Sequence, residues 1–154
     1  MHYWLMKTEP SSFSVDDLAA APRRTTAWDG VRNYQARNML RDQMHRGDEA
    51  FLYYSSCEVP GVAAIVKIVK EGYPDETQFD RKHAHFDPES KRAAPRWYMV
   101  DVRLERRLSR VITLQELRAH AVKELRGMVL LRAGNRLSVT PVEAAHWKFI
   151  LSLE

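Results

Sequence analysis

The sequence predicts an α+β fold, in which a small curved β-barrel carries helices at its periphery. Five segments have the alternating or β-branched pattern of strands, and four others have helix-start signals or helical spacing. Five or six mostly antiparallel strands in such a setting are typical of a small barrel. The chain has 154 residues, and domains usually run to roughly 100–200, so we expect one domain over residues 1–154.

The N-terminal half is predicted to form strands over residues 3–7, 49–55 and 62–69 and helices over 14–20 and 34–44. The first strand alternates around Trp4 and Met6. Ser14 followed by Asp17 is typical of a helix N-terminus, and Gly47 is placed to end the second helix. The two later strands are rich in aromatic and β-branched residues, as buried strands are.

The C-terminal half is predicted to hold strands over residues 97–108 and 137–140 and helices over 113–120 and from 140 onward. Residues 97–108 alternate cleanly between two faces, and Thr113 with Glu116 forms a capping box. Thr140, Pro141 and Glu143 match the N-cap, first and third positions of the last helix. We expect the buried face of this helix to hold Ala144, Trp147, Ile150 and Leu151.

Residues 72–95 are interpreted as an ordered excursion over one face of the domain. The segment contains three prolines and many charges and shows little periodicity. Loops of this length are usually functional or disordered. Its aromatic residues Tyr73, Phe79 and Phe86 are too many for a plain linker, which favours an ordered loop.

The composition excludes several classes of protein. The longest apolar run, residues 62–66, is far shorter than the ~18 residues of a membrane span. Residues 2–7 lack the basic start and long apolar stretch of a signal peptide. Cys57 is the only cysteine, which excludes an internal disulfide framework. We therefore expect a cytoplasmic protein with no membrane partner.

Neither a metal site nor a catalytic centre is apparent. His83 and His85 stand two residues apart with Asp80 and Asp87 nearby, but nothing in the sequence completes a tetrahedral zinc site. Cys57 has no adjacent base, and the glycine patterns of phosphate-cradling loops are absent. The sequence therefore predicts no metal, no cofactor and no catalytic residue.

The segment 28–34 has the composition of a binding loop that leads into a helix. Trp28 offers a flat apolar wall on which a nucleobase can stack, and Asn33 offers both a donor and an acceptor. Free backbone N–H groups at the following helix N-terminus favour an anion. The alternative is that Trp28 belongs to the core and Asn33 caps the helix, and residue type alone leaves the two open.

Two further segments could converge on the same place. Tyr53 and Ser55 share one face at the end of a strand. Arg136 and Ser138 place a cation and a hydroxyl shortly before the final helix. The alternative places Tyr53 in the core and Arg136 on an ordinary surface.

Several segments together resemble the EVE domain family. The resemblance extends from residue 3 to residue 153, and it is carried by the motifs at residues 4–10, 28–38, 73–75, 95–97, 99–102 and 136–139. It implies a PUA-like fold related to the YTH readers of methylated adenine. It also implies a non-catalytic reader, which takes a modified, methylated base of DNA or RNA from a single strand, or flipped from a duplex, into a pocket.

The resemblance also assigns site residues. It makes Trp28 a pocket wall and places the floor, rim and polar contacts at Gly30, Val31, Arg32, Asn33, Lys7, Glu9, Tyr53, Ser55, Arg136 and Ser138. Tyr54 departs from the family pattern, which often has His there. A second aromatic of the pocket stays open among Phe79, Phe86 and Trp97. A methyl group on a base favours such a dry aromatic surface.

These expectations can be tested by geometry. Trp28, Asn33, Tyr53 and Ser138 should line one concave site. The charge, +4 from 24 Lys and Arg against 20 Asp and Glu, should be uneven, with Arg32, Arg37 and Arg136 near its mouth. Two alternatives remain, an enzyme acting on a nucleotide or small polar substrate in the same pocket, and a protein-interaction adaptor with an exposed apolar patch. We expect a monomer.

Overall fold

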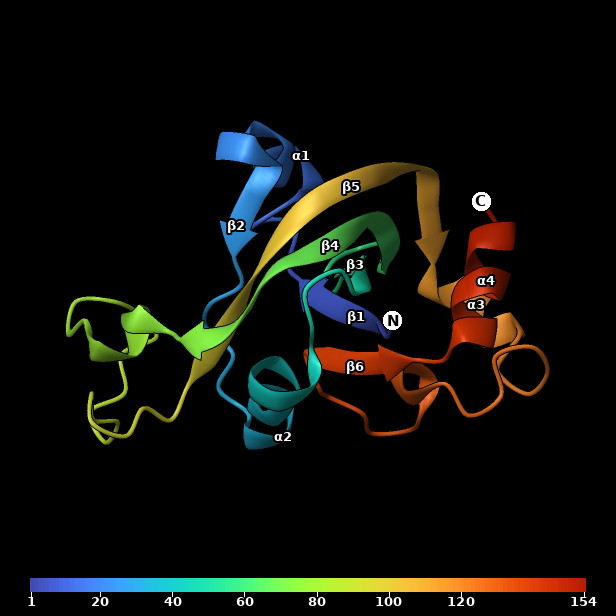
Figure 1. Ribbon diagram of the computed structural model, residues 1–154. Coiled ribbons are helices and arrows are strands. Elements are labelled where there is room, and N and C mark those ends of the chain that lie inside the picture. The colour runs from blue at the N-terminus through green and yellow to red at the C-terminus, as the bar shows by residue number, and fades with distance from the viewer.

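A six-stranded curved sheet forms the centre of the computed structural model, which describes residues 1–154 (Figure 1). Its strands are β1 (Tyr3–Thr8), β2 (Thr25–Ala27), β3 (Glu49–Tyr54), β4 (Gly61–Pro74), β5 (Tyr98–Thr113) and β6 (Val139–Val142). Their order is β2-β5-β4-β3-β1-β6, and only β1 and β3 pair in parallel. The long strands β4 and β5 arch over β1 and β3, while β2 and β6 remain as edges. The α+β class is confirmed, with a curved sheet that stays open.

Helices lie around this sheet. They are α1 (Val15–Ala20), α2 (Tyr34–Asn38), α3 (Leu114–Ala119) and α4 (Ala144–Ser152). Complete capping boxes start α1 at Ser14 and α3 at Thr113, as predicted. A π-helical turn over Met39–Gln43 extends α2, with Met44 as its C-cap, so Gly47 lies beyond the end of the helix. None of the helices has the length and apolar character that a crossing of the bilayer requires.

The predicted last helix needs correction, and one strand was missed. Thr140 and Pro141 do not start the last helix, because the sheet edge takes them into β6 opposite β1; α4 begins at Ala144, after Glu143 as N-cap. An edge strand accepts Pro141 because its missing N–H can face away from the ladder. Of the expected buried face, Trp147 and Ile150 are buried, Leu151 is half-buried and Ala144 is exposed. The short strand β2 was not predicted, since three residues carry no pattern.

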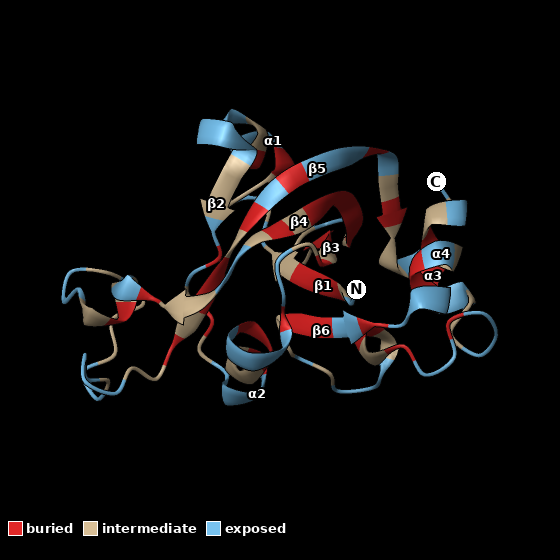
Figure 2. Ribbon diagram, viewed as in Figure 1, coloured by how far each residue is buried: buried red, intermediate tan, exposed pale blue.

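Much of the central strands is buried (Figure 2), and successive side chains of β1 and β3 alternate between two hydrophobic clusters. One face packs with α1 through Leu18, with α2 through Ala36 and with the following π-helical turn through Leu40. The other packs with α3 and α4 through Leu117, Trp147 and Ile150. The protein therefore has two hydrophobic clusters, one on each side of the central strands.

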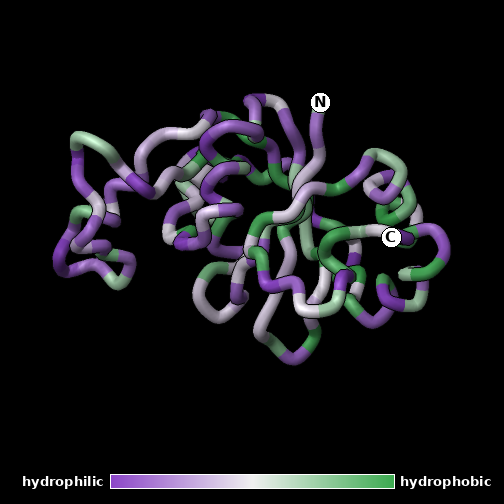
Figure 3. The backbone as a smooth tube through the Cα atoms, turned by 90° about the horizontal axis from the view of Figure 1, so that it is seen from below, coloured by the Kyte–Doolittle hydropathy of each residue, from purple (hydrophilic) through white to green (hydrophobic).

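Residues 75–97 project from one end of the molecule as a largely hydrophilic excursion (Figures 1 and 3). The buried Gln78 anchors it: its amide donates to the carbonyl oxygens of Asp75 and Trp97 at 2.7 and 2.9 Å and accepts from the Ser90 hydroxyl at 2.5 Å. Trp97 also donates its indole N–H to Asp87 at 2.7 Å. The excursion is thus ordered, as predicted, but it projects from one end instead of covering a face, and polar contacts hold it.

Candidate functional site

A cavity of about 670 Å³ opens where the end of β1, the 26–32 segment and the 75–97 excursion meet. This volume lies within the ~300–1,000 Å³ range of ligand sites. Seven of the eleven residues expected in the site line it: Lys7, Glu9, Trp28, Gly30, Val31, Arg32 and Ser138. The remaining lining residues include Ser12, Phe13, Thr26, Asp29 and His85. Segments far apart in the sequence therefore converge as expected for most of the site.

Trp28 is both a core residue and a cavity wall. It is only 7% exposed and belongs to the hydrophobic cluster that contains α1 and α2. Its backbone N–H donates to Val100 O at 2.8 Å, which continues the pairing of β2 with β5 into the loop. Trp28 packs within the core, as one reading of the sequence held, and it also borders the cavity, which is the place that the other reading gave it.

A buried ion pair holds the loop that follows Trp28. The Asp75 carboxylate is fully buried; it accepts from Gly30 N at 2.9 Å, from Arg32 Nη1 at 3.0 Å and from Thr77 N at 2.9 Å. Burial alone would raise the pKa of Asp75, but the hydrogen bonds from Thr77, Gly30 and Arg32 outweigh burial and lower it. Asp75 is thus ionised at neutral pH and fixes the shape of the cavity floor.

Arg32 braces the site instead of offering its charge to a ligand. Its guanidinium makes five hydrogen bonds, to the Val31 and His85 carbonyl oxygens, the Asp75 carboxylate and the Thr77 hydroxyl. A guanidinium has five N–H donors, so all of them are used within the protein. Arg32 lies at the cavity as predicted, and its contacts tie the 28–32 loop to the excursion.

Gly30 is required by its neighbour as well as by its backbone. Its φ of +80° lies in the left-handed region, and a Cβ there would come within 2.4 Å of the His85 ring. The imidazole of His85 therefore packs directly against the Gly30 backbone. This contact makes His85 part of the cavity wall.

Lys7 carries the free positive charge of the cavity. Its backbone N–H donates to Ser138 O at 2.8 Å, which keeps both residues at the same end of the sheet. No carboxylate lies within 4.0 Å of its ammonium, and burial lowers the pKa of this group. An unpaired, half-buried ammonium is available to an anionic or hydrogen-bonding ligand.

Three expected residues lie in hollows next to the cavity. Ser55 and Arg136 line an adjoining hollow of about 510 Å³, which shares Lys7, Glu9 and Ser138 with the cavity. Tyr53 is 3% exposed and belongs to the cluster on the opposite face, although it borders a further hollow of about 210 Å³ beside Lys7. Burial raises the pKa of Tyr53 to about 12.

Asn33 and Arg37 lie outside the cavity. Asn33 Oδ1 accepts from Ala36 N at 3.0 Å, so this residue is the N-cap of α2 and does not line the cavity. The expectation of one concave site thus holds for Trp28 and Ser138 but not for Asn33 and Tyr53. Arg37 is likewise outside it and donates to Arg96 O.

The second ring of the cavity comes from residues that sequence reasoning missed. Phe79, Phe86 and Trp97 do not line it, whereas Phe13 and the His85 imidazole do. Trp97 instead stacks on Tyr34 at 4.9 Å between ring centroids. The sequence shows that Phe13 precedes the helix cap Ser14, but it does not indicate which way the Phe13 ring points.

One group of side chains at the cavity rim has the chemistry of a metal site. Donor atoms of Asp29, His83 and His85 all lie within 4.8 Å of one another. Asp80 and Asp87, which stand near the histidines in the sequence, are not part of this group.

Comparison with known proteins agrees with the sequence resemblance. The family model described as "EVE domain" matches residues 2–153. Human thymocyte nuclear protein 1 is 48% identical over 167 residues, covering 99% of this chain and 73% of that protein. The zebrafish (Danio rerio) protein of the same name is 49% identical, covering 98% and 71%.

Solved structures show the same fold. The human THYN1 protein in complex with 5-methylcytosine-containing DNA superposes with a TM-score of 0.95 at 46% identity, covering 99% of this chain and 97% of that one. A Pseudomonas syringae protein gives a TM-score of 0.91 at 44% identity, with 98% of each chain covered. A Zymomonas mobilis ASCH protein, at 10% identity and a TM-score of 0.55, shares the fold alone. The family match over nearly the whole length and these identities establish that the chain belongs to the EVE domain family.

Proposed function

We propose that this protein is a non-catalytic reader of methylated DNA and that the cavity beside Trp28 receives a 5-methylcytosine base flipped from the helix. The observation that carries the proposal is the cavity itself, in a chain 46% identical to the human THYN1 protein, whose structure is a complex with 5-methylcytosine-containing DNA. The sequence left DNA and RNA open, and this relative favours DNA.

The walls of the cavity fit the faces and the methyl group of such a base. Trp28 and Phe13 supply aromatic surface, and Val31 supplies an aliphatic one. Base–aromatic stacking contributes about 1–3 kcal/mol, and a methyl group gains by leaving water. A methylated pyrimidine is therefore the kind of ligand that these walls stabilise.

The rim of the cavity fits the edge of the base. Glu9 can accept from the exocyclic amine of cytosine, a pairing that carboxylates make with this base. Lys7 and Ser138 can donate to its ring acceptors. Uracil and thymine lack the exocyclic donor, so Glu9 would be left unpaired against them, and a site of this kind rejects such analogues strongly.

The hydroxyl groups of the cavity lack the partner that nucleophilic catalysis needs. No hydrogen bond joins a serine or threonine hydroxyl of the cavity to the imidazole of His85, and an activated hydroxyl nucleophile needs such a base. The buried carboxylate of Asp75 and the partly exposed guanidinium of Arg32 are committed to each other. These two observations favour binding as the role of the cavity.

Fluorescence anisotropy with matched oligonucleotides tests the proposal. One sequence is prepared as DNA with either cytosine or 5-methylcytosine at the central position. Each of these is tested as a single strand, as a paired duplex and as a duplex mismatched at that position. The same sequence is also prepared as RNA. We expect methylation to strengthen DNA binding by up to about 10–200-fold. Mismatched and single-stranded forms should bind better than the paired duplex, because unstacking then costs less.

Lys7→Met should weaken binding of every oligonucleotide, whereas Lys148→Met, on the exposed side of α4, should leave it unchanged. Equal affinity for methylated and unmethylated DNA would contradict the reader proposal. Tighter binding of RNA than of DNA would mean that the ligand is RNA and would contradict the proposed ligand. Mass spectrometry of the oligonucleotide after incubation covers the enzyme alternative, since any product would refute a purely binding role.

A further inference from the structure

We propose that Asp29, His83 and His85 form a binding site for a divalent transition-metal ion of the zinc class at the rim of the cavity. Their donor atoms lie within 4.8 Å of one another. Asp29 comes from the loop after Trp28 and the histidines come from the 75–97 excursion, so only the fold brings them together. An ion here would tie two separate loops.

The donor set selects the class of ion. Two imidazole nitrogens and one carboxylate oxygen suit Zn²⁺, Co²⁺ or Ni²⁺, whereas Mg²⁺ and Ca²⁺ favour oxygen ligands alone. Three protein ligands leave at least one coordination position open. Because Asp29 and His85 also line the cavity, that position would be accessible from it.

Two observations indicate unused binding capacity in this group. Nδ1 of His85 is buried and has no hydrogen-bond partner, a state that costs free energy and is uncommon in folded proteins. Asp29 forms no ion pair, although Arg32 lies in the same loop, because Arg32 is paired with Asp75. The group therefore combines an exposed carboxylate that has no ion pair with a histidine that has a buried nitrogen without a partner.

The other acidic residues of the excursion are already engaged. Asp87 accepts from the Trp97 indole at 2.7 Å and from Glu89 N at 2.9 Å. Asp80 accepts from Lys82 N at 3.0 Å. Asp29 is thus the carboxylate left to complete the histidine pair.

Binding would require a small rearrangement of the histidine turn. Donor atoms around a tetrahedral Zn²⁺ with bonds of about 2.0–2.1 Å stand about 3.3 Å apart, so the group has to contract by up to about 1.5 Å. His83 Nδ1 now accepts from His85 N at 3.0 Å. If His83 binds the ion through Nδ1, the ion displaces the His85 N–H from that atom. If it binds through Nε2, the ring proton moves to Nδ1, which can then no longer accept. In either case we expect this hydrogen bond to break when the ion binds.

The test uses the full-length protein without nucleic acid, freed of metal with a chelator that is then removed. Co²⁺ is titrated while its visible absorption is recorded, and Zn²⁺ is titrated by calorimetry. We expect one equivalent of each ion to bind. His83→Ala and Asp29→Ala should each weaken binding by at least about tenfold, since even outer-sphere partners of a metal contribute about 10–100-fold.

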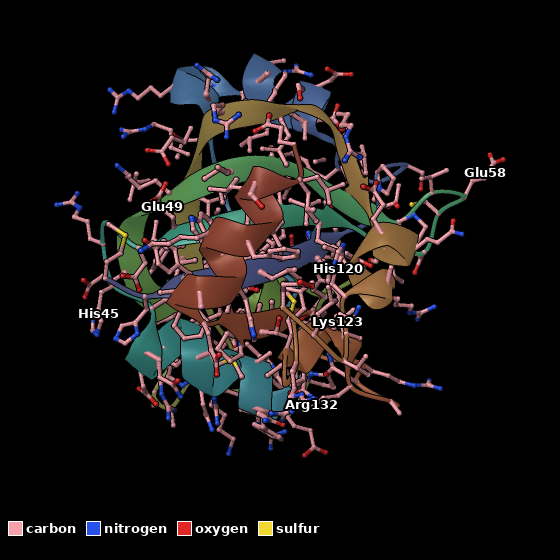
Figure 4. The ribbon with its side chains drawn as sticks, turned by 90° about the vertical axis from the view of Figure 1, so that its right-hand side faces the viewer. His45, Glu49, Glu58, His120, Lys123 and Arg132 are labelled. Atoms are coloured by element: carbon pink, nitrogen blue, oxygen red, sulfur yellow. The ribbon has the colours of Figure 1, made fainter.

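His120→Ala is the matched control. His120 lies 2.9 Å from Glu124 at the end of α3, on the side of the molecule that faces the viewer in Figure 4, away from the excursion. This variant should bind the ion as the wild type does. Loss of binding in His120→Ala, or unchanged binding in His83→Ala, would mean adventitious surface binding and would overturn the proposal.

Amide hydrogen exchange supplies a second readout that does not depend on affinity. The His85 amide should exchange faster, or shift its NMR resonance, when one equivalent of Zn²⁺ is added, and it should not respond in His83→Ala. Absence of any response at His85 in the wild type would contradict the site. Because no DNA is present, these results stand apart from the success or failure of the reader proposal.

Discussion

Two tryptophans, one in each hydrophobic cluster, have nearly the same exposure and different surroundings. Trp147 is 4% exposed, and the rings of Phe51 and Tyr3 stack on it at centroid distances of 3.9 and 4.4 Å. Trp28 is 7% exposed and packs on the other cluster while it borders the cavity. Burial alone therefore does not distinguish a ring that only packs in the core from one that also borders a cavity; the neighbours of the residue do.

The supports of the two regions differ as well. The end that carries α3 and α4 is held by apolar packing, with its charged side chains at the outside (Figure 4). The cavity end is held by a buried carboxylate and a guanidinium. Polar supports fix direction and distance more strictly than apolar contacts do, which suits a site that must keep its shape while empty.

The largest expected effect is on stability at the α4 end. Trp147→Ala should lower the free energy of unfolding by about 3–5 kcal/mol, because it removes a large buried ring and leaves a void. Chemical denaturation measures this decrease. DNA affinity per folded molecule should stay unchanged, and a parallel drop in affinity would break the contrast between the two regions.

Asp75→Asn sharpens the contrast through pH. The variant should be destabilised by about 1.5–3 kcal/mol at pH 7, the range for hydrogen bonds to a charged group. Because the folded-state pKa of Asp75 is lowered, its stabilising contribution is complete above the ordinary value of about 3.9 and is lost as the pH falls through the folded-state pKa. The free energy of unfolding, measured by chemical denaturation at several pH values between neutral and acid, should therefore depend less on pH for the variant than for the wild type.

Trp28→Ala should affect both properties. The loss of a stacking face predicts a drop in DNA affinity of about 1–3 kcal/mol, or about 5–150-fold. Its membership of the core predicts a loss of stability as well, smaller than that of Trp147→Ala because one side already borders the cavity. Titration and thermal unfolding of the same sample measure the two, and unchanged affinity would make Trp28 purely structural.

Arg136→Ala should give the smallest effect. Arg136 is exposed beside the cavity, where an interaction with a DNA phosphate would weaken with salt. The slope of the logarithm of the binding constant against the logarithm of the salt concentration should become shallower by about 0.7–0.9, because the variant neutralises one phosphate fewer. The change should be equal for methylated and unmethylated DNA. Arg126→Ala, at the α3 end, serves as the control, and an effect that depends on methylation would assign Arg136 to base recognition.

The sequence by itself determined the local features and most of the site. The capping boxes at Ser14 and Thr113 and the alternation of the strands depend on residues a few positions apart, so they could be predicted and are confirmed. The motif residues Lys7, Trp28 and Ser138 come together as the resemblance implied.

Tertiary structure decided where local signals compete or where no local signal exists. Thr140 and Pro141 resemble a helix start, but pairing with β1 draws them into a strand, because a sheet edge offers backbone hydrogen bonds that a short helix end does not. The residue type of Asn33 fits both a helix N-cap and a ligand contact. In the structure the Ala36 N–H donates to its side-chain oxygen, which makes it the cap. Asp29 and His85 lie far apart in the sequence, and no spacing rule spans their separation, because they meet only when the excursion folds back against the loop after Trp28.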